Sequence, residues 1–327
     1  MLELRGVTKR YGDRLAVDDL SLTVEPGQMF GFVGTNGAGK TTTMRIIMGV
    51  LAPDSGTVSW KGRAADADAR RGFGYMPEER GLYPKMKVHE QLVYLAALRG
   101  TERTAAETRT SELLAEFGLT ERANDRVEEL SLGNQQRVQL MAALVHEPDF
   151  LILDEPFSGL DPVGVDSLAR ILDVRVRQGV GVLFSSHQLD LVERLCDAVG
   201  IIKAGRIVAS GTVEELRRSN RPRRYRIGVA APAGWAADVP GVVRAEYDGS
   251  DDADATTIVE LTSEADDQRL LDAARRAGRV TAFAPIEPTL TELFREAVSN
   301  RALDEEQPGA PSDRTDARSH ESREVAV

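Results

Sequence analysis

The sequence predicts an α/β fold, in which a mainly parallel sheet, an antiparallel edge sheet and a helical insert are followed by a small α+β domain. Three observations carry this prediction. Short apolar runs alternate with helical patterns over residues 1–217, a glycine-rich loop follows the run that ends at Val33, and strand signals are absent from about residue 84 to residue 147. Nearly continuous apolar strands are typical of parallel sheets covered by helices.

Hydrophobic periodicity defines the elements of the first domain. Continuous apolar runs predict buried parallel strands at residues 29–33, 150–153, 180–184 and 199–202. Alternating polarity predicts the antiparallel edge sheet at residues 2–7, 20–24 and 57–60. Within the insert, helical spacing links Leu92, Leu95 and Leu98, and then Leu113, Leu114 and Phe117.

The second half of the chain has a different composition. Arginines and Pro222 predict a solvated linker at residues 218–224, with contact to a partner or to anionic lipid as the alternative. An accessory domain is expected at residues 225–300, where strands at 225–229, 242–247, 257–261 and 280–285 and helices at 265–277 and 289–298 suit a split βαβ sandwich. Charged and small residues dominate the tail, residues 301–327, which we expect to be disordered.

Composition narrows the class of protein. The chain has 327 residues, a net charge of -11 and one cysteine, Cys196, so it can form no intramolecular disulfide, and Cys196 is interpreted as buried packing. Acidity without a long basic stripe argues against a nucleic-acid partner. Because the chain lacks a basic-then-apolar leader and any run of about 20 apolar residues, we expect a cytoplasmic protein that reaches a membrane through a partner.

The glycine-rich loop matches the phosphate-binding pattern Gly-x-x-x-x-Gly-Lys-[Ser/Thr]. Its glycines let successive backbone N–H groups point at one anion, while Lys40 reaches the outer phosphates and the Thr41 hydroxyl reaches Mg²⁺. The residues expected to contact nucleotide here are Gly34, Asn36, Gly37, Ala38, Gly39, Lys40, Thr41 and Thr42. The alternative is a glycine-rich turn with an exposed lysine.

Carboxylates and a histidine follow two other predicted strands. Asp154 ends an apolar strand and is expected to be a partner of Mg²⁺, and the adjacent Glu155 can polarise a water for attack on the terminal phosphate. His187 follows the strand at 180–184; a lone histidine is more often a packed or surface residue. Since ligands bind at the carboxyl ends of parallel strands, we expect the loop, the carboxylates and His187 to converge there.

One segment of the helical insert has the properties of an anion-binding helix start. Ser131 is suited to cap the helix that continues through Met141, and Gly133 lets a phosphate approach the positive N-terminal end. As a plain helix cap the segment would be unremarkable.

In order and spacing, these motifs resemble the nucleotide-binding subunit of an ATP-binding cassette (ABC) transporter, over roughly residues 2–216. The resemblance implies that Tyr11 stacks on adenine, that residues 130–135 form the signature stretch with Ser131, Gly133 and Asn134 near the nucleotide, and that residues 158–161 form a dimer-contacting loop. It further implies that Asp154 binds magnesium, that Glu155 is the catalytic carboxylate, and that His187 senses the terminal phosphate. The family works as head-to-tail dimers that sandwich two ATP molecules, so Ser131 and Gly133 would act in trans.

Two departures from the family pattern affect the candidate site. Glu78 stands where the family usually has glutamine, which would place an acidic group near Mg²⁺ and near the transmembrane contact, and Glu78 remains a candidate metal ligand. The signature is loosened, because Leu132 and Asn134 replace the commoner glycine and glutamine, whereas Gly133 is retained.

The C-terminal segment, residues 288–294, is similar to that of ATPases of sodium-efflux and drug-resistance exporters. This implies an ATP-hydrolysing exporter subunit that is peripheral on the inner face of the cell membrane, held there by a separate permease docked on the helical insert. The alternative is a soluble ABC ATPase that acts on ribosomes or nucleic acid; such proteins usually carry two cassettes, and this chain shows one phosphate loop and no sustained heptads. A small-molecule P-loop kinase would leave the signature segment unexplained.

Overall fold

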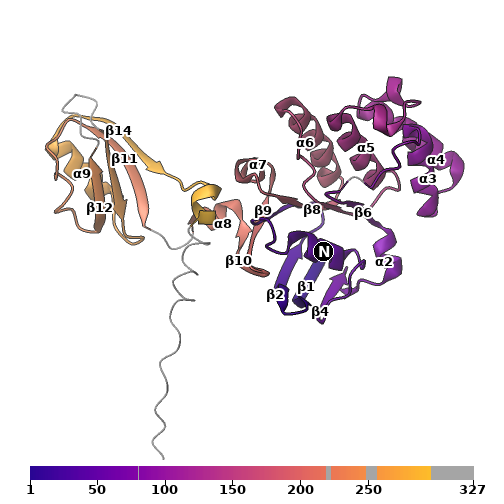
Figure 1. The fold of residues 1–327 in the computed structure, drawn as a ribbon. Helices are drawn as coiled ribbons and strands as arrows, with labels where there is room; N and C mark the ends of the chain where they lie inside the picture. The colour runs from indigo at the N-terminus through magenta and orange to yellow at the C-terminus, as the bar shows by residue number, and fades with distance from the viewer. Residues whose placement is uncertain (80, 219–221, 248–255, 296–327) are drawn as a thin grey trace, which may run out of the picture.

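The computed structural model describes the chain except residues 80, 219–221, 248–255 and 296–327. A six-stranded sheet, in the order β10-β9-β3-β8-β7-β6, forms the centre of the first domain, and β6, β7, β8, β3 and β9 pair in parallel while β10 is antiparallel to β9 (Figure 1). Its strands are β3 (Met29–Val33), β6 (Phe73–Met76), β7 (Phe150–Leu153), β8 (Gly181–Ser186), β9 (Ala198–Lys203) and β10 (Arg206–Thr212). The predicted parallel sheet is confirmed.

A second, antiparallel sheet covers one face of the parallel sheet. Its order is β2 (Arg14–Val24), β1 (Leu2–Tyr11), β4 (Ser55–Trp60) and β5 (Arg63–Ala64). Successive side chains of β3 and β7 point to opposite faces of the parallel sheet, which explains the two layers. Phe30, Phe32 and Phe150 pack into the core between the two sheets, as does α1 (Lys40–Ile47), whereas their neighbours in sequence face the helices. Trp60, Phe73 and Phe150 form edge-to-face and tilted ring contacts between the two sheets, with centroids 5.1–5.7 Å apart.

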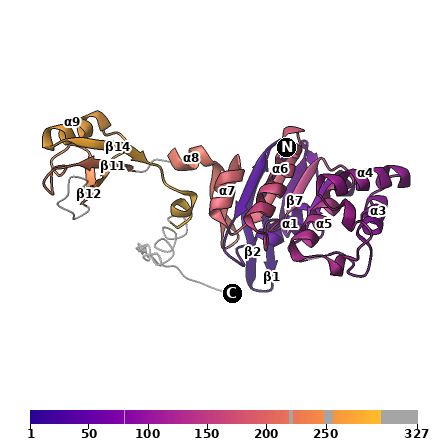
Figure 2. The same cartoon turned by 90° about the horizontal axis from the view of Figure 1, so that it is seen from above.

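Helices cover the other face, and the insert forms one end of the domain (Figure 2). The insert consists of α3 (Val88–Leu98), α4 (Arg103–Glu116), two 3₁₀ turns (Thr120–Arg122 and Val127–Glu129) and α5 (Leu132–Leu144). Leu92, Leu113, Leu114 and Phe117 are buried there, as their spacing predicts, whereas Leu95 is only partly buried and Leu98 is 64% exposed. The remaining helices of the domain are α2 (Ala67–Arg71), α6 (Pro162–Arg177), α7 (Leu189–Leu195) and α8 (Val213–Arg218).

The accessory domain is a four-stranded antiparallel sheet, in the order β12-β13-β11-β14, with one helix packed on it. Its elements are β11 (Arg223–Val229), β12 (Val242–Tyr247), β13 (Thr256–Leu261), α9 (Asp267–Ala277) and β14 (Val280–Ile286). Both β13 and β14 pair antiparallel with β11, so they run parallel to each other with β11 between them. This is the split βαβ arrangement that the sequence predicts. The expected acidic turn at residues 248–254 and the tail at 301–327 lie outside the described residues.

Two expectations at the junction of the domains differ from the structure. The helix that begins at Leu290 does not join the accessory domain: Leu290 and Leu293 are buried in the core of the first domain, because their apolar faces fit against α7 and its neighbours. The arginines of the expected linker are also paired rather than merely solvated. Arg223 and Arg224 begin β11, and Arg224 lies 3.5 Å from Glu260 and 3.6 Å from Glu292.

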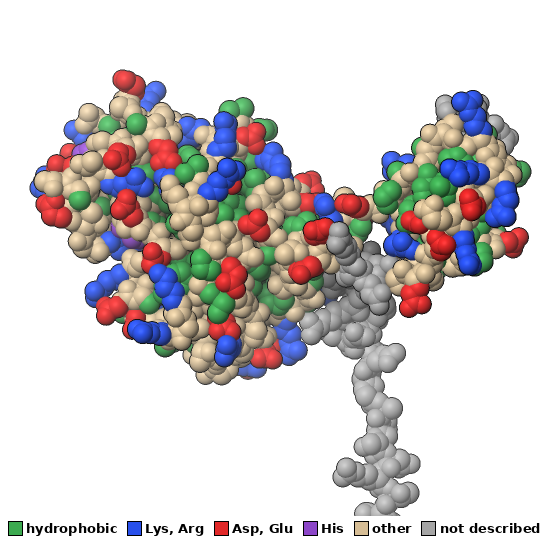
Figure 3. All heavy atoms as spheres, turned by 180° about the vertical axis from the view of Figure 1, so that it is seen from behind, with side chains coloured by type: hydrophobic (Ala, Val, Ile, Leu, Met, Phe, Trp, Pro, Cys, Tyr) green, Lys and Arg blue, Asp and Glu red, His purple; other side chains and the backbone are tan. Residues whose placement is uncertain are grey.

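Charges of both signs are interspersed over the face of the first domain shown in Figure 3. Among the residues that the structure describes, no helix is both long and apolar enough to cross a membrane.

Candidate nucleotide-binding and catalytic site

The phosphate-binding loop connects the end of β3 to the start of α1. Gly39 is the N-cap of α1 with φ of 113°, and a Cβ atom there would lie 2.5 Å from the carbonyl oxygen of Ala16. Gly37 also has a positive φ, 77°. The glycines are therefore required both for the backbone conformation and for close contact with the neighbouring strand.

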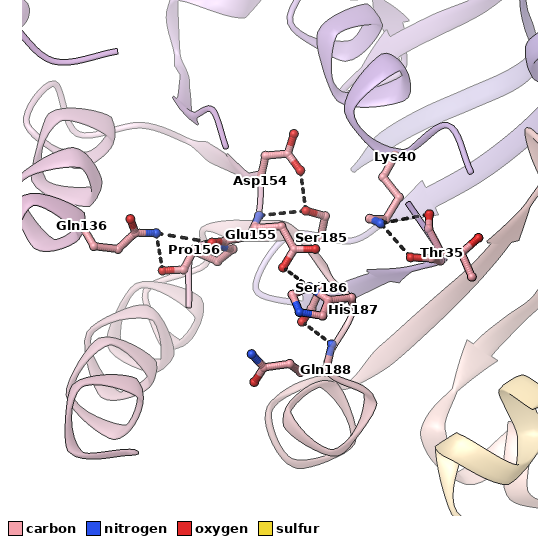
Figure 4. A network of polar contacts seen from close by, with 11 residues as sticks. Thr35, Lys40, Gln136, Asp154, Glu155, Pro156, Ser185, Ser186, His187 and Gln188 are labelled. Atoms are coloured by element: carbon pink, nitrogen blue, oxygen red, sulfur yellow. Dashed lines mark hydrogen bonds and ion pairs between the residues drawn. The ribbon is translucent and has the colours of Figure 1, made fainter. Parts of the chain in front are cut away.

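Lys40 is held at the mouth of this loop. Its side chain is buried, and Nζ donates to the carbonyl oxygens of Gly34 at 2.7 Å and Thr35 at 3.4 Å (Figure 4). The alternative of a glycine-rich turn with an exposed lysine is wrong, since Lys40 is only 7% exposed. A buried ammonium group held by neutral carbonyls can supply its full positive charge to an anion in the loop.

Asp154 lies immediately after β7 and is fixed by the neighbouring strand. The Ser185 hydroxyl of β8 donates to Asp154 Oδ1 at 2.5 Å and accepts from the backbone N–H of Glu155 at 2.8 Å. Asp154 is 1% exposed, and its Oδ2 is buried without a hydrogen-bond partner. A buried carboxylate oxygen with a free lone pair is the acceptor expected for a metal-bound water or a cation.

Glu155 adopts a strained backbone conformation and pairs with His187. Its φ is 51°, in the left-handed region that non-glycine residues rarely occupy, and its Oε2 lies 3.0 Å from His187 Nδ1. Burial raises the pKa of the Glu155 carboxyl above its ordinary value, and the hydrogen bond from His187 and the charge of Lys40 partly oppose this. A desolvated carboxylate beside a histidine is suited to accept a proton from water.

These residues open onto one cavity of about 390 Å³ at the carboxyl ends of the parallel strands. Its lining includes the predicted Tyr11, Asn36, Gly37, Gly39, Lys40, Thr41, Thr42, Glu78, Asp154 and Glu155, together with Arg14 and Ala16. Four segments that are separated in sequence (residues 11–16, 36–42, 78 and 154–155) therefore meet at one sheet edge. His187 joins them through Glu155 and has a half-exposed side chain.

The signature stretch lies apart from this cavity. Ser131 caps α5, with its hydroxyl accepting from the backbone N–H of Asn134 at 3.4 Å, and neither Ser131, Gly133 nor Asn134 lines the cavity. One turn further along α5, Gln136 Nε2 donates to the carbonyl oxygens of Pro156 at 2.8 Å and Glu155 at 3.3 Å. The start of α5 is thus linked through Gln136 to the turn that contains Glu155 and Pro156 (Figure 4).

Three residues that contribute hydrogen bonds to the site were not predicted from the sequence. Arg14 Nη2 donates to the carbonyl oxygen of Gly37 at 3.2 Å. Ser185 donates to the Asp154 carboxylate and accepts from the backbone N–H of Glu155, and Gln136 links α5 to the turn after Asp154. Arg14 lies three residues after Tyr11, and Ser185 directly follows the strand predicted at residues 180–184, so position offered a weak signal for both. Gln136 had none, because its role depends on tertiary packing.

A phosphate loop after β3 and an Asp-Glu pair after β7, at the same edge of a parallel sheet with β8 between the two strands, define a P-loop ATPase cassette. Two family models match the chain: "ABC transporter" over residues 17–158, and "ATP-binding protein DrrA1-3-like, C-terminal domain" over residues 211–298. The chain belongs to the ATP-binding subunits of ABC transporters, a family that hydrolyses ATP to power transport.

Relatives support this assignment along nearly the whole chain. An ABC transporter ATP-binding protein of Bacillus subtilis, YhaQ, is 41% identical over 91% of this chain and 98% of its own length. The linearmycin resistance ATP-binding protein LnrL of B. subtilis is 37% identical over 66% of this chain and 70% of its own length. The Nod factor export ATP-binding protein I of Burkholderia orbicola is 38% identical over 67% of this chain and 73% of its own length.

A solved ATP-binding subunit of an ABC transporter has a TM-score of 0.61 and 35% identity, and the match covers 67% of this chain and 92% of that one. These findings confirm the predicted ATP-binding subunit of an ABC transporter over the soluble alternative.

Proposed function

We propose that this chain hydrolyses MgATP at a site completed by a second copy of itself, and that the resulting motion drives export through a separate permease. The observation that carries the catalytic part is the convergence of Lys40, Asp154 and Glu155 on one cavity. Glu155 is the base that takes a proton from the attacking water, and Lys40 compensates negative charge on the outer phosphates. Tyr11, at the rim and half exposed, offers an aromatic face to adenine.

His187 is proposed to orient the base and to respond to the terminal phosphate. Its Nδ1 lies 3.0 Å from Glu155 Oε2, so the ring fixes which way the carboxylate points. The second ring nitrogen, Nε2, is the group through which this half-exposed side chain would bind a nucleotide oxygen. This arrangement couples the state of the phosphate to the geometry of the base.

The residues present fit a magnesium ion. Asp154 offers a buried oxygen without a protein partner, the Thr41 side chain lines the same cavity, and Glu78 is the third candidate. Mg²⁺ is usually held by one or two carboxylates together with waters and substrate phosphates, which such a set satisfies. When bound, the ion neutralises charge on the β- and γ-phosphates.

A homodimer is proposed because the signature stretch does not reach its own chain's cavity. Ser131 and Gly133 begin α5, where the helix end is suited to an anion, and that anion must come from another molecule. Solved cassettes of the same fold support the proposal, since one is described as a dimeric bacterial ABC transporter cassette with a TM-score of 0.60.

The helical insert offers an apolar surface for the permease. Tyr83, Tyr94 and Leu98 are 53%, 41% and 64% exposed, and the two tyrosine rings contact each other edge-on at 6.2 Å. Exposed aromatic and apolar groups gathered on one surface are typical of protein interaction sites. Docking there would hold the chain at the inner face of the membrane. The names of the relatives LnrL and Nod factor export protein I support export as the direction.

Two substitutions test the catalytic part. Lys40→Ala removes the charge at the loop mouth and should weaken ATP binding and lower kcat by about 100-fold or more. Glu155→Gln removes the base, so kcat should fall by a similar factor of about 100 while ATP still binds. Steady-state ATPase assays and binding of a fluorescent ATP analogue separate the two effects. Normal hydrolysis in both variants would overturn the proposal.

A further inference from the structure

The chain crosses twice between the first domain and the accessory domain, and both crossings meet on α7. The outgoing crossing leaves from α8, and the returning one follows β14 to the helical segment from Leu290 (Figures 1 and 2). We call residues 287–294 the strap. Leu290 is 0% and Leu293 3% exposed, and both belong to the same core cluster as Leu191 and Val192 of α7.

Polar contacts fix the strap to α7 as well. The backbone N–H of Leu290 donates to Glu193 Oε2 at 3.2 Å, and the Thr291 hydroxyl lies 3.4 Å from Asp190 Oδ1. Arg217 of α8 pairs with Glu193 and also lies 3.3 Å from Glu287 of the strap. Glu193 is therefore the carboxylate on α7 at which both crossings are joined.

The strap itself is preformed for this contact. The Thr289 backbone N–H donates to Glu292 Oε2 at 3.0 Å, while the Glu292 N–H donates to the Thr289 hydroxyl at 3.2 Å. This reciprocal pattern is a capping box, which fixes where the helix starts and so which side chains face α7.

On its other side, α7 packs against the strand that leads to the phosphate loop. A Cβ atom at Gly31 of β3 would lie 2.4 Å from Val192 Cγ1, so helix and strand are in direct contact. Just after α7, Asp197 makes two hydrogen bonds to Met29 of β3. Its Oδ2 accepts from the Met29 N–H at 2.8 Å, and its backbone N–H donates to the Met29 carbonyl oxygen at 2.9 Å. Only one residue, Gln188, separates His187 from the first turn of α7, and its N–H donates to the Ser186 hydroxyl at 3.0 Å.

From this geometry we infer that the strap positions His187 by holding α7 in place. Glu193 of α7, which binds the strap, is the principal positioning residue. Undocking the strap removes two buried side chains and two hydrogen bonds from α7, and α7 then shifts relative to β8. Because His187 is attached to α7 through a single residue, its ring loses alignment with Glu155. The inference rests on the proposed role of His187, and it gives the accessory domain a physical connection to the catalytic base.

The experiment uses the full chain and two kinds of variant. Glu193→Gln weakens the polar joint with little change in volume, and Leu290→Ala combined with Leu293→Ala empties the apolar contact. The matched controls lie in the accessory domain: Glu246→Gln breaks an exposed ion pair with Arg244, and Val243→Ala trims an exposed side chain. Circular dichroism checks that each variant is folded. If the double leucine variant does not fold, Glu193→Gln alone tests the inference.

Two readouts are measured, histidine ring NMR and ATPase kinetics. The His187 ring signal, assigned by its loss in His187→Ala, should shift or broaden in Glu193→Gln and in the leucine variant, while the His146 signal stays in place. In the same variants kcat should fall by about tenfold with the KM for ATP within about twofold, since misplacing a catalytic group affects chemistry more than binding. The control variants should behave as wild type in both readouts.

The outcomes separate the two proposals. If the His187 signal is unchanged in both strap variants, or changes as much in Glu246→Gln, the positioning role is overturned. If the signal shifts but His187→Ala retains full kcat, the strap inference stands and the proposed catalytic role of His187 fails.

Discussion

Glu155 combines burial, a left-handed backbone and a histidine partner, and its titration gives a prediction. The ordinary pKa of a glutamate is 4.5, and burial raises that of Glu155 in the folded chain. Since only the ionised carboxylate can act as base, kcat should fall on acidification at a pH above the range of an ordinary glutamate. The residual activity of His187→Ala should fall at higher pH still, because the His187 hydrogen bond lowers the Glu155 pKa.

The measurement is kcat against pH at saturating MgATP, with circular dichroism at each pH to exclude unfolding. The sign follows from protonation: lowering pH through the raised pKa neutralises the base and stops proton transfer. An acid limb at the ordinary glutamate value, unmoved by loss of His187, would contradict the assignment of Glu155 as base.

Glu78 is the residue at which this chain departs most clearly from the family pattern. It lines the cavity with Lys40 and Asp154, and its side chain is exposed, so replacement should not disturb packing. Glu78→Gln keeps a metal-binding oxygen and removes a negative charge facing the phosphates, so ATPase activity should be retained, with kcat equal to or a few-fold above wild type. Steady-state ATPase assays over a Mg²⁺ titration measure this, with Glu79→Gln as the neighbouring control. Complete loss of hydrolysis would refute the placement of this loop beside the metal.

Sequence alone predicted the site residues that share a contiguous motif. The phosphate loop that ends at Lys40 and the Asp154–Glu155 pair each begin where an apolar strand ends, so strand direction brings them to one edge. Ser185 and Gln136 could not be found this way, because their partners are 31 and 20 residues away in the chain and the contacts depend on how strands and helices are juxtaposed. The pairing of His187 with Glu155 likewise depends on the neighbouring order of β7 and β8.

At the scale of elements, the link between α5 and the catalytic turn depends on one side chain. Gln136 is buried and donates to two carbonyl oxygens of the turn that follows Asp154. Gln136→Leu leaves those carbonyls without this donor, which should lower the free energy of unfolding by about 1–3 kcal/mol. It should also lower kcat, because the turn that holds Glu155 loses its support.

Urea unfolding measures the stability change. Trp60 lies in the core of the first domain, so in a Trp235→Phe background its fluorescence reports on the unfolding of that domain. Gln268→Leu in α9 is the control for replacing a glutamine by an apolar side chain. If Gln136→Leu unfolds at the wild-type urea concentration with unchanged kcat, the bridge has no energetic role.

Helix boundaries and helix partners differ in how well sequence predicts them. The apolar spacing of Leu290 and Leu293 indicated a helix, and the structure has one from Leu290. Periodicity defines which face of a helix is apolar but not which surface covers it, so the packing of this helix on the core of the first domain was not predicted. What decides the partner is the complementary surface of α7 and the carboxylate of Glu193, neither of which is local in sequence.

At the scale of the whole molecule, the order of the motifs was sufficient for the fold class, because parallel strands with helical crossovers admit few topologies. The relation between cassette and accessory domain was not predictable, since it depends on ion pairs such as Arg217 with Glu193 and Glu287.

Assembly is the last consequence at this scale. Because the signature stretch of one chain does not line its own cavity, ATP should act as the bridge between two copies. In Glu155→Gln, which binds ATP without hydrolysing it, the complex should persist, and the measured mass should rise from 35.6 kDa to about twice that value on addition of MgATP. Light scattering after size-exclusion chromatography gives the mass.

The matched variant adds Gly133→Asp to Glu155→Gln. A Cβ atom at Gly133 would lie 3.4 Å from Leu160 Cδ2, an ordinary contact, so the monomer should tolerate the side chain. Its negative charge would repel the phosphates of the partner's nucleotide, whereas each chain's own loop is untouched. We therefore expect this double variant to bind ATP with unchanged affinity and to remain monomeric. Dimerisation of the double variant, or a persistent monomer in Glu155→Gln saturated with MgATP, would show that the signature stretch does not complete the site in trans.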